Sequence, residues 1–474
     1  MPAERSAALL WAPRARLRDR WREHVVLRIG RDGRWAEVTP DVPTPPEGAH
    51  VLEGPLLPSL VDAHSHAFQR AFVGAAETRA GGQDDFWSWR DRMYDVARRI
   101  TPPQLRAIAA HLYVELLRGG YTQVCEFHYL RRDVDGSEYA DPLAMSWALA
   151  DAAADAGIGL TILPVLYERA GFAADDLRAE QRRFRASPHD VVAAARTIAA
   201  ARRPLVEAGL AVHSLRAAGA DAIDALRRLA TDVDGPIHIH VAEQAGEVSE
   251  CLRLHGMRPI EWLARRGALD RRWQLVHATH AIGSEIEATA RSGAAIVVCP
   301  GTEANLGDGI CNLSAWLAAG VPVSIGSDSH VTRDWREELR LLEYGQRLVL
   351  RRRNVAAAPE EGIASSAERL FARAAAASAA AAGLGSWGLV AGARADALVV
   401  DPRDPALRGV ASERLLDALV FSSPTLRWRD VLVAGRWRVR AGRHRAAAAI
   451  ADRFAAVLAE LGAPGPSATA PLSS

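Results

Sequence analysis

Short apolar runs alternate with longer amphipathic segments along most of this chain. Eight such runs, each rich in Val, Ile or Leu and short enough for one strand, lie between about residues 55 and 330. They cover 57–66, 121–129, 158–167, 209–217, 236–243, 273–280, 294–303 and 321–330. Strands that alternate with helices in this number predict an α/β fold, a (β/α)8 TIM-like barrel, rather than a doubly wound sheet.

The segments between the runs carry helix signals. Thr101 and Pro102 open an apolar-periodic segment that stops before Gly119 and Gly120, which gives a cap, a proline at the first position and a glycine stop. Helical patterns also cover 140–156, 190–208, 220–231, 245–266 and 284–292. We expect one helix in each of these segments.

The two ends of the chain differ from the middle. The N-terminal stretch holds a strand-like piece at 25–29, residues 388–401 resemble a turn and a strand, and 429–442 resemble a hairpin. We expect these pieces to pair into one small β-sandwich domain built from both chain ends. The predicted segments are 1–55 and 386–445 for this domain, 56–385 for a catalytic barrel, and 446–474 for a helix and a disordered tail.

Polar residues sit late in the apolar runs. The runs close on residues that bind metals, carry protons or bind anions: His64 and His66; Glu126 and His128; His213 and Arg216; His238, His240 and Glu243; His277 and His280; Glu303; Asp328 and His330. Active sites of (β/α)8 barrels lie at the carboxyl ends of the strands. We therefore expect these side chains to meet at one end of the barrel.

His64 and His66 are the first candidate metal ligands. Residues two apart on a strand point to the same face, so both imidazoles can reach one ion, although such pairs also occur as ordinary buried polar groups. His240 is the third predicted imidazole ligand, and Asp328 ends the strand that neighbours the first in a closed barrel. Three histidines and one aspartate leave a position open for water, as a catalytic site requires.

The same strand ends supply candidate proton carriers. Glu243 follows the fifth run and is the predicted proton shuttle, while Asp328 is placed to accept a proton from a bound water. His277 is expected to steady the nucleophile or polarise the electrophile, with His280 as its competitor. We expect His238 to orient a ligand through a hydrogen bond.

The amino-acid composition excludes or disfavours several classes of protein for this chain. All 58 basic residues are arginine, so a phosphate-binding lysine, a Schiff-base lysine and a carboxylated lysine between two metals are excluded. The net charge of +1 shows no basic excess for nucleic acid. The four cysteines form no CxxC pair, which disfavours a zinc ribbon and favours buried thiols. No signal peptide or membrane-length apolar run is visible, so the sequence predicts a cytoplasmic protein without a membrane partner.

Together these motifs resemble the amidohydrolase superfamily, in its single-metal deaminase branch. A closer likeness, to the formimidoylglutamate deiminases, lies in longer stretches. These are HSHAFQRA at 64–71, FWSWR at 86–90, CEFHY at 125–129, VHSLRA at 212–217, TEANLGDG at 302–309, GSDSHV at 326–331 and LEYGQR at 342–347.

This resemblance implies hydrolysis of N-formimino-L-glutamate, a linear amidine, to N-formyl-L-glutamate and ammonia in histidine breakdown. It implies one divalent metal ion, zinc first and iron(II) as the alternative, and a homodimer. Arg90 and Arg216 would bind the two carboxylates of this small-molecule substrate, with Tyr129 and His213 assisting and Gln69 near the formimino end.

Two other interpretations stay open. Another single-metal deaminase would act on a purine, pyrimidine or triazine ring, and its pocket would need aromatic stacking and amide contacts rather than two arginines. A metal-free barrel that has lost catalysis would lack some ligands or the proton shuttle, yet every one of these residue types is present in the sequence.

Overall fold

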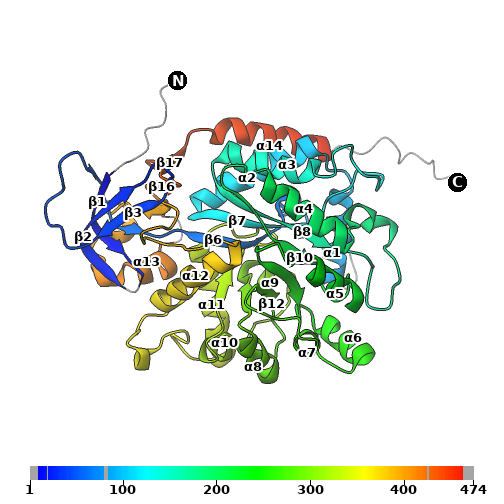
Figure 1. Cartoon of the computed structure of the whole chain (residues 1–474). Helices are drawn as coiled ribbons and strands as arrows, with labels where there is room; N and C mark the ends of the chain where they lie inside the picture. The colour runs from blue at the N-terminus through cyan, green and yellow to red at the C-terminus, as the bar shows by residue number, and fades with distance from the viewer. Residues whose placement is uncertain (1–8, 19, 80–83, 424–425, 463–474) are drawn as a thin grey trace.

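The computed structural model describes residues 9–18, 20–79, 84–423 and 426–462 of the chain. It contains a barrel of parallel strands surrounded by helices, beside a second sheet made from both chain ends (Figure 1). The predicted disordered tail, residues 463–474, lies outside the described residues.

The barrel strands follow one another in chain order around the ring. They are β6 (Leu60–Ser65), β7 (Tyr121–His128), β8 (Gly159–Leu166), β10 (Leu210–Val212), β11 (Ile237–Val241), β12 (Trp273–His277), β13 (Ala295–Val298) and β14 (Val323–Ile325). A parallel bridge between Ser65 and Asp328 brings the last strand back to the first. Each of the eight apolar runs contains one of these strands, so the predicted barrel is confirmed.

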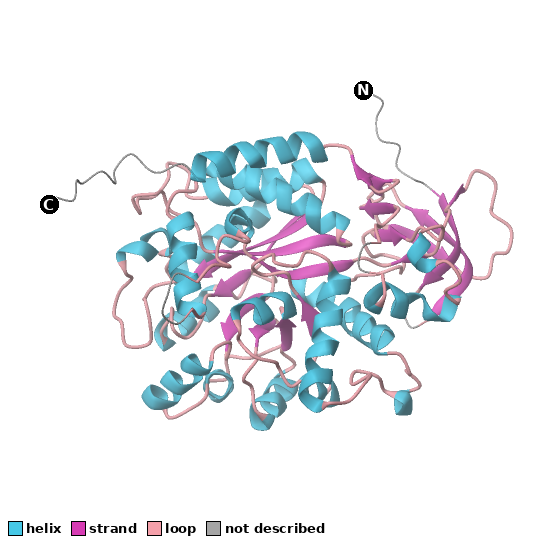
Figure 2. Ribbon diagram, turned by 180° about the vertical axis from the view of Figure 1, so that it is seen from behind, coloured by secondary structure: helices cyan, strands magenta, loops and turns pink. Residues whose placement is uncertain are grey.

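All residues of these strands are buried, as in parallel sheets that helices cover on the outside. Figure 2 shows this arrangement, with the strands inside a layer of helices. The helices are α1 (Phe86–Ala97), α2 (Pro102–Arg118), α3 (Ala144–Ala156), α4 (Pro188–Ala200), α5 (Ala220–Leu229), α6 (Ala245–His255), α7 (Pro259–Arg265), α8 (Gly283–Ser292), α9 (Pro300–Leu306), α10 (Leu313–Ala318), α11 (Trp335–Leu350) and α12 (Ser366–Ala382). Short 3-10 helices are η1 (Ala67–Phe72), η2 (Ala179–Phe184), η3 (Pro359–Glu361), η4 (Pro405–Leu407) and η5 (Ser412–Arg414).

Two helix predictions are wrong in extent. The single helix predicted over 245–266 is two helices, because Gly256 adopts a left-handed conformation with φ of 65° and Pro259 starts the next helix. The helix predicted over 190–208 ends at Ala200, and β9 (Val206–Ala208) pairs with β8 instead.

The second sheet joins the beginning of the chain to its end. Its strands run in the order β18 (Arg443–His444), β17 (Arg436–Arg440), β16 (Asp430–Val433), β15 (Ala397–Val399), β5 (Leu56–Leu57), β1 (Leu9–Arg16), β2 (Trp21–Ile29) and β3 (Trp35–Thr39), with β4 (His50–Val51) beside β1. The pairing of Leu57 with Leu398 connects the two halves. The expected small β domain from both ends is present, while its exact boundaries at residues 55, 385 and 445 stay a prediction.

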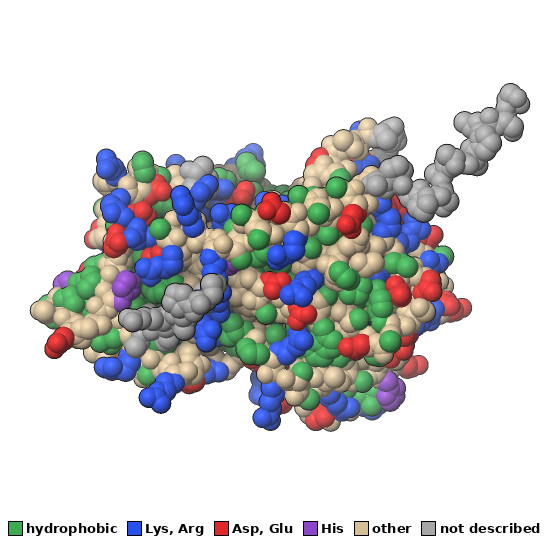
Figure 3. All heavy atoms as spheres, turned by 90° about the horizontal axis from the view of Figure 1, so that it is seen from above, with side chains coloured by type: hydrophobic (Ala, Val, Ile, Leu, Met, Phe, Trp, Pro, Cys, Tyr) green, Lys and Arg blue, Asp and Glu red, His purple; other side chains and the backbone are tan. Residues whose placement is uncertain are grey.

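Two further helices follow the barrel. α13 (Leu415–Phe421) lies in the C-terminal segment, and α14 (Ala447–Gly462) packs on α2, where the Phe454 ring stacks on His111 at 4.3 Å (Figure 1). Arginines and acidic side chains are interspersed on the face of the molecule in Figure 3. None of the helices described in the structure is long and apolar enough to cross a membrane.

Candidate active site

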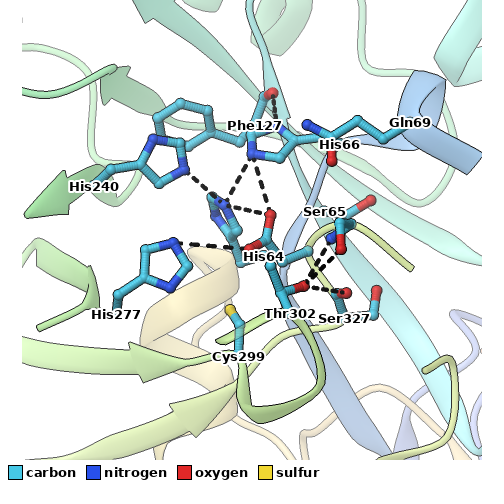
Figure 4. Close-up of polar contacts among 12 residues, drawn as sticks. His64, Ser65, His66, Gln69, Phe127, His240, His277, Cys299, Thr302 and Ser327 are labelled. Carbon is cyan, nitrogen blue, oxygen red and sulfur yellow. Dashed lines mark hydrogen bonds and ion pairs between the residues drawn. The ribbon is translucent and has the colours of Figure 1, made fainter. Parts of the chain in front are cut away.

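Three histidines meet at the carboxyl ends of β6 and β11. The Nε2 atom of His64 lies 3.2 Å from Nε2 of His66 and 2.9 Å from Nε2 of His240. All three side chains are buried. Figure 4 shows the three rings turned toward one centre, with His277 approaching from another strand. The structure therefore brings the three predicted imidazole ligands together.

The chemistry of these rings fits a bound cation. The Nδ1 atom of His66 lies 3.0 Å from the carbonyl oxygen of Phe127. Because a carbonyl only accepts, Nδ1 carries the proton and Nε2 presents a lone pair. Burial lowers the pKa of His66 to about 3 and the pKa values of His64 and His240 well below the ordinary value, so the rings are neutral. Neutral imidazoles that converge on one point are a donor set suited to zinc or iron(II).

Asp328 joins this cluster from the end of β14. Its backbone N–H donates to the His64 carbonyl at 2.9 Å, and its own carbonyl accepts from the His66 N–H at 3.2 Å. These bonds place its Oδ1 atom 3.6 Å from His64 Nε2 and 3.4 Å from His66 Nε2. The residue has a φ of 49°, a strained left-handed conformation, and burial raises the pKa of its carboxyl to about 7.

His277 lies between three carboxylates at the end of β12. Its Nε2 atom is 3.7 Å from Glu243 Oε1 and 3.7 Å from Asp328 Oδ2, and its Nδ1 is 3.3 Å from Glu303 Oε1. Burial lowers its pKa, but the nearby carboxylate charges outweigh that effect and raise the pKa to about 10. The competing residue, His280, does not line the pocket, so the geometry favours His277.

Glu243 connects the histidine cluster to the pocket. It follows β11, where its Oε1 atom faces His277 and its Oε2 atom lies 3.5 Å from a terminal nitrogen of Arg216. Its backbone N–H donates to Glu247 at 3.1 Å, which fixes the turn after the strand. The predicted proton shuttle thus lies beside both a histidine and a cation.

The role predicted for His238 is wrong. We expected this residue to orient a metal ligand, but its Nε2 atom contacts the backbone carbonyl oxygen of Ala381 at 2.9 Å. Its Nδ1 atom is buried and has no hydrogen-bond partner within the described residues. His238 and His240 lie two residues apart and so share one face of β11, but His238 is nearer the start of the strand and contacts α12 instead of the cluster.

Two buried carboxylates that the sequence analysis did not assign hold the turns that carry the predicted ligands. Asp62 accepts hydrogen bonds from the backbone N–H and hydroxyl of Ser327, at 2.8 and 2.6 Å. Glu126 accepts from the Ser65 hydroxyl at 2.8 Å and from the Ala67 N–H at 2.6 Å. Burial raises the pKa of Asp62 to about 7 and that of Glu126 to about 8. In the sequence, these two carboxylates could have been noticed because charged residues are unusual within or at the end of apolar runs.

One pocket opens onto the cluster and contains every predicted substrate residue. It is lined by Gln69, Arg90, Tyr129, His213 and Arg216, together with Glu243, His277 and Asp328. Gln69, on η1, donates to the Tyr129 hydroxyl at 3.3 Å. The His213 ring lies 5.5 Å from the Tyr129 ring and 5.1 Å from the His240 ring. The five residues come from separate parts of the chain but share one cavity.

Two arginines in this pocket lie against one aromatic ring. The guanidinium carbon of Arg90 is 4.7 Å from the Trp87 ring centre, and that of Arg216 is 5.6 Å from the same centre. The Nε atoms of both arginines are buried and have no hydrogen-bond partner among the described residues. Buried guanidinium groups with unused donors are suited to bind carboxylates.

A glycine is required where the end of β14 approaches the predicted ligand His64. A Cβ atom at Gly326 would lie 2.6 Å from His64 Cβ and 2.8 Å from its backbone nitrogen. We predict that Gly326→Ala lowers the free energy of unfolding by about 1–3 kcal/mol and reduces the metal content, since the strand ends must separate. Thermal unfolding and metal analysis test this, with Gly283→Ala, whose added methyl meets open space, as the control. Unfolding temperatures that match for both variants would contradict the packing argument.

Comparison with known proteins places this site in a family. The sequence model of the Amidohydrolase family matches residues 56–438. The chain belongs to the amidohydrolase family. The resemblance seen in its motifs is therefore confirmed at the level of the family.

Individual relatives of this amidohydrolase extend the comparison. A formimidoylglutamate deiminase from Pseudomonas aeruginosa is 44% identical over 456 residues, which cover 95% of this chain and 99% of that protein. An 8-oxoguanine deaminase from the same organism is 28% identical over 83% of this chain and 86% of its own length. A crystal structure of an amidohydrolase from Brucella melitensis has a TM-score of 0.90 and 39% identity, covering 96% of this chain and 100% of that one.

Proposed function

We propose that this amidohydrolase hydrolyses N-formimino-L-glutamate to N-formyl-L-glutamate and ammonia, the reaction of histidine breakdown that its motifs imply. The observation that carries the proposal is a single pocket that contains Glu243, the histidine cluster, the partly buried Arg90 and the buried Arg216, which contacts Glu243. The 44% identity to a formimidoylglutamate deiminase over nearly both full lengths supports it. We also propose that the enzyme forms a homodimer, as the resemblance implies, and that it acts in the cytoplasm, as predicted from the sequence.

We propose one divalent metal ion as cofactor, with zinc expected first and iron(II) as the alternative. His64, His66, His240 and Asp328 would hold it, since their donor atoms converge at the end of the barrel. When bound, such an ion acidifies water toward a pKa of about 7, which makes hydroxide available at neutral pH. A second ion bridged by a carboxylated lysine is excluded because the chain has no lysine.

The carboxylates and His277 divide the proton transfers. In the hydrolysis, the water oxygen adds to the amidine carbon, the bond from that carbon to the terminal nitrogen breaks, and both water protons leave on ammonia. Asp328 would accept the first proton, and Glu243 would deliver a proton to the departing nitrogen. The Nε2 atom of His277 lies 3.7 Å from an oxygen of each carboxylate, and in the charged form its single Nε2–H would donate to a group bound between them.

The pocket also matches the rest of the substrate. Formiminoglutamate carries two carboxylates, and each of Arg90 and Arg216 offers a buried Nε–H that no described residue accepts. The Arg216 contact to Glu243 uses only one of its terminal nitrogens, at 3.5 Å, so the guanidinium group keeps other donors for the substrate. Tyr129, His213 and Gln69 line the same pocket as the arginines and the histidine cluster.

An ammonia-release assay on formiminoglutamate tests this proposal, with Arg90→Ala and Arg216→Ala beside the wild type. Each variant should lower kcat/KM by about 10- to 100-fold, because a hydrogen bond to a charged group contributes about 1.5–3 kcal/mol. Arg253→Ala, on the exposed side of α6, is the matched control. If Arg90→Ala and Arg216→Ala match the wild type, the arginines do not bind the carboxylates even if the reaction is correct.

The competing assignment, a deaminase of a purine, pyrimidine or triazine ring, is an outcome of the same assay. The 8-oxoguanine deaminase relative keeps this alternative in view, although its identity of 28% is lower. Guanine and cytosine are therefore assayed beside formiminoglutamate. Faster ammonia release from either base would overturn the proposed substrate.

A further inference from the structure

Two tyrosine hydroxyls form a pair on the pocket wall. Tyr94 lies on α1 and Tyr167 follows β8, and their hydroxyl oxygens are 3.5 Å apart. Both side chains are buried and both line the pocket that contains Arg90 and Arg216. The sequence motifs gave neither tyrosine a role.

Gln181, on η2, determines how these hydroxyls are hydrogen-bonded. Its Oε1 atom lies 3.0 Å from the backbone nitrogen of Arg178. Because a backbone N–H only donates, the atom that faces it must be the amide oxygen, so the orientation of the amide is fixed. The Nε2 group therefore faces the tyrosines and donates to Tyr167 at 2.9 Å and to Tyr94 at 3.2 Å. Gln181 is itself fully enclosed, with 1% of its surface exposed.

This arrangement leaves hydroxyl protons available to a ligand. Each tyrosine oxygen already accepts a hydrogen bond from Gln181, so each can still donate its own proton. One hydroxyl can donate to the other across 3.5 Å, but then the second proton still has no acceptor in the pair. Burial raises the pKa of Tyr167 well above its usual value, which keeps this hydroxyl protonated. The pair thus presents donors, and a carboxylate, which only accepts, is its natural partner.

The position of the pair indicates which carboxylate it meets. The His213 ring lies 5.1 Å from the ring of the predicted ligand His240, and the Tyr167 ring lies 4.4 Å beyond His213. The pair is therefore separated from the histidine cluster by another ring. The guanidinium carbon of Arg90 is 5.5 Å from the Tyr94 ring, so a cation lies beside the donors. In formiminoglutamate, the side-chain carboxylate is the one farther from the amidine carbon.

We propose that Tyr94 and Tyr167 donate hydrogen bonds to the side-chain carboxylate of the substrate and that Gln181 positions them for this. The pair would then determine specificity for an amidine whose far end carries a carboxylate. This inference rests on the proposed function, which supplies the substrate.

Conservative substitutions test the two hydroxyls. On formiminoglutamate, Tyr94→Phe and Tyr167→Phe should each lower kcat/KM by about 10-fold and the double variant by about 100-fold, mainly through KM. On N-formimino-L-norvaline, in which a methyl group replaces the side-chain carboxylate, the double variant should stay within about 2-fold of the wild type. If the norvaline compound is not turned over, its inhibition constant against formiminoglutamate is compared instead. Tyr344→Phe, on the outer face of α11, is the control.

Gln181→Glu tests the hydrogen-bond direction itself. A carboxylate at this position would accept from both hydroxyls and turn their protons away from the pocket. We expect a loss on formiminoglutamate similar to that of the double phenylalanine variant, and none on the norvaline compound. Gln181→Met removes the amide without adding charge and should give a smaller loss in the same direction. Unfolding temperature and metal content show whether each variant is folded.

The results separate this inference from the proposed function. Wild-type turnover of formiminoglutamate with unchanged kinetics in the tyrosine variants overturns the inference alone, as does an equal loss on both substrates. If the wild type releases no ammonia from formiminoglutamate, the proposed function fails. The pair is then tested by calorimetric binding of L-glutamate to the metal-loaded enzyme. Weaker binding in the double variant would support a carboxylate site, and unchanged binding would overturn it.

Discussion

Glu243→Gln should lower kcat for ammonia release by about 100- to 10,000-fold, the range typical for loss of a positioned acid or base. Glutamine keeps the shape of the side chain and, through its single acceptor oxygen, one of the two contacts to His277 and Arg216, but it cannot carry a proton between water and the leaving nitrogen. KM should change little, because the substrate carboxylates bind elsewhere in the pocket. Steady-state kinetics on formiminoglutamate measure both constants.

The control for this variant is Glu250→Gln, a change of the same chemistry on the outer side of α6. Metal content and unfolding temperature should match the wild type in both variants, since Glu243 is not one of the proposed ligands. A kcat for Glu243→Gln above about one-tenth of the wild type would show that another group moves the proton.

Removal of the metal should abolish activity and lower the unfolding temperature. The histidine cluster places neutral ring nitrogens within 4.8 Å of one another, and a cation that binds them only in the folded state stabilises that state. We expect dialysis against a chelator to reduce ammonia release at least about 1,000-fold, because acidified water is then lost. Titration with zinc or iron(II) should restore activity and reach a plateau at one equivalent.

Histidine variants supply the matched comparison. His64→Asn should lose the metal, whereas His189→Asn, at an exposed position near the start of α4, should retain it. A purified protein with less than about half an equivalent of metal, and no activity when zinc is added, would indicate a barrel that has lost catalysis. A plateau at two equivalents would contradict the single-metal proposal.

The sequence predicted the barrel because its strands are buried on both faces and read as uninterrupted apolar runs. The sequence pattern was less accurate for the ends of the strands. Ala242, His277 and Asp328 all have positive φ values, of 51°, 69° and 49°. At these residues the chain leaves the strand direction, yet their letters continue the run, so β11, β12 and β14 end before the predicted segments. Periodicity contains no information on such backbone reversals.

The site residues also fall into those that the sequence revealed and those that only the structure revealed. The metal and proton-carrying candidates could be found because their residue types are rare in apolar strands. Glu126 and Asp62 also lie in apolar strands. Only the folded structure shows that they accept hydrogen bonds from the turns around His64 and Asp328. Gln181 gave no signal at all, since it lies in a short 3-10 helix and acts through two tyrosines that are distant in sequence.

The sheet made from both chain ends also affects how the protein is made. β5 pairs with β1 on one side and with β15 on the other, and it lies immediately before β6, which carries His64. During translation, β1 to β5 leave the ribosome long before β15 to β17 exist, so the edge of β5 stays unpaired while the barrel is synthesised. Unpaired apolar edges favour aggregation. A nascent chain of this kind therefore depends on rapid completion, or on chaperones that cover the edge until its last strands arrive.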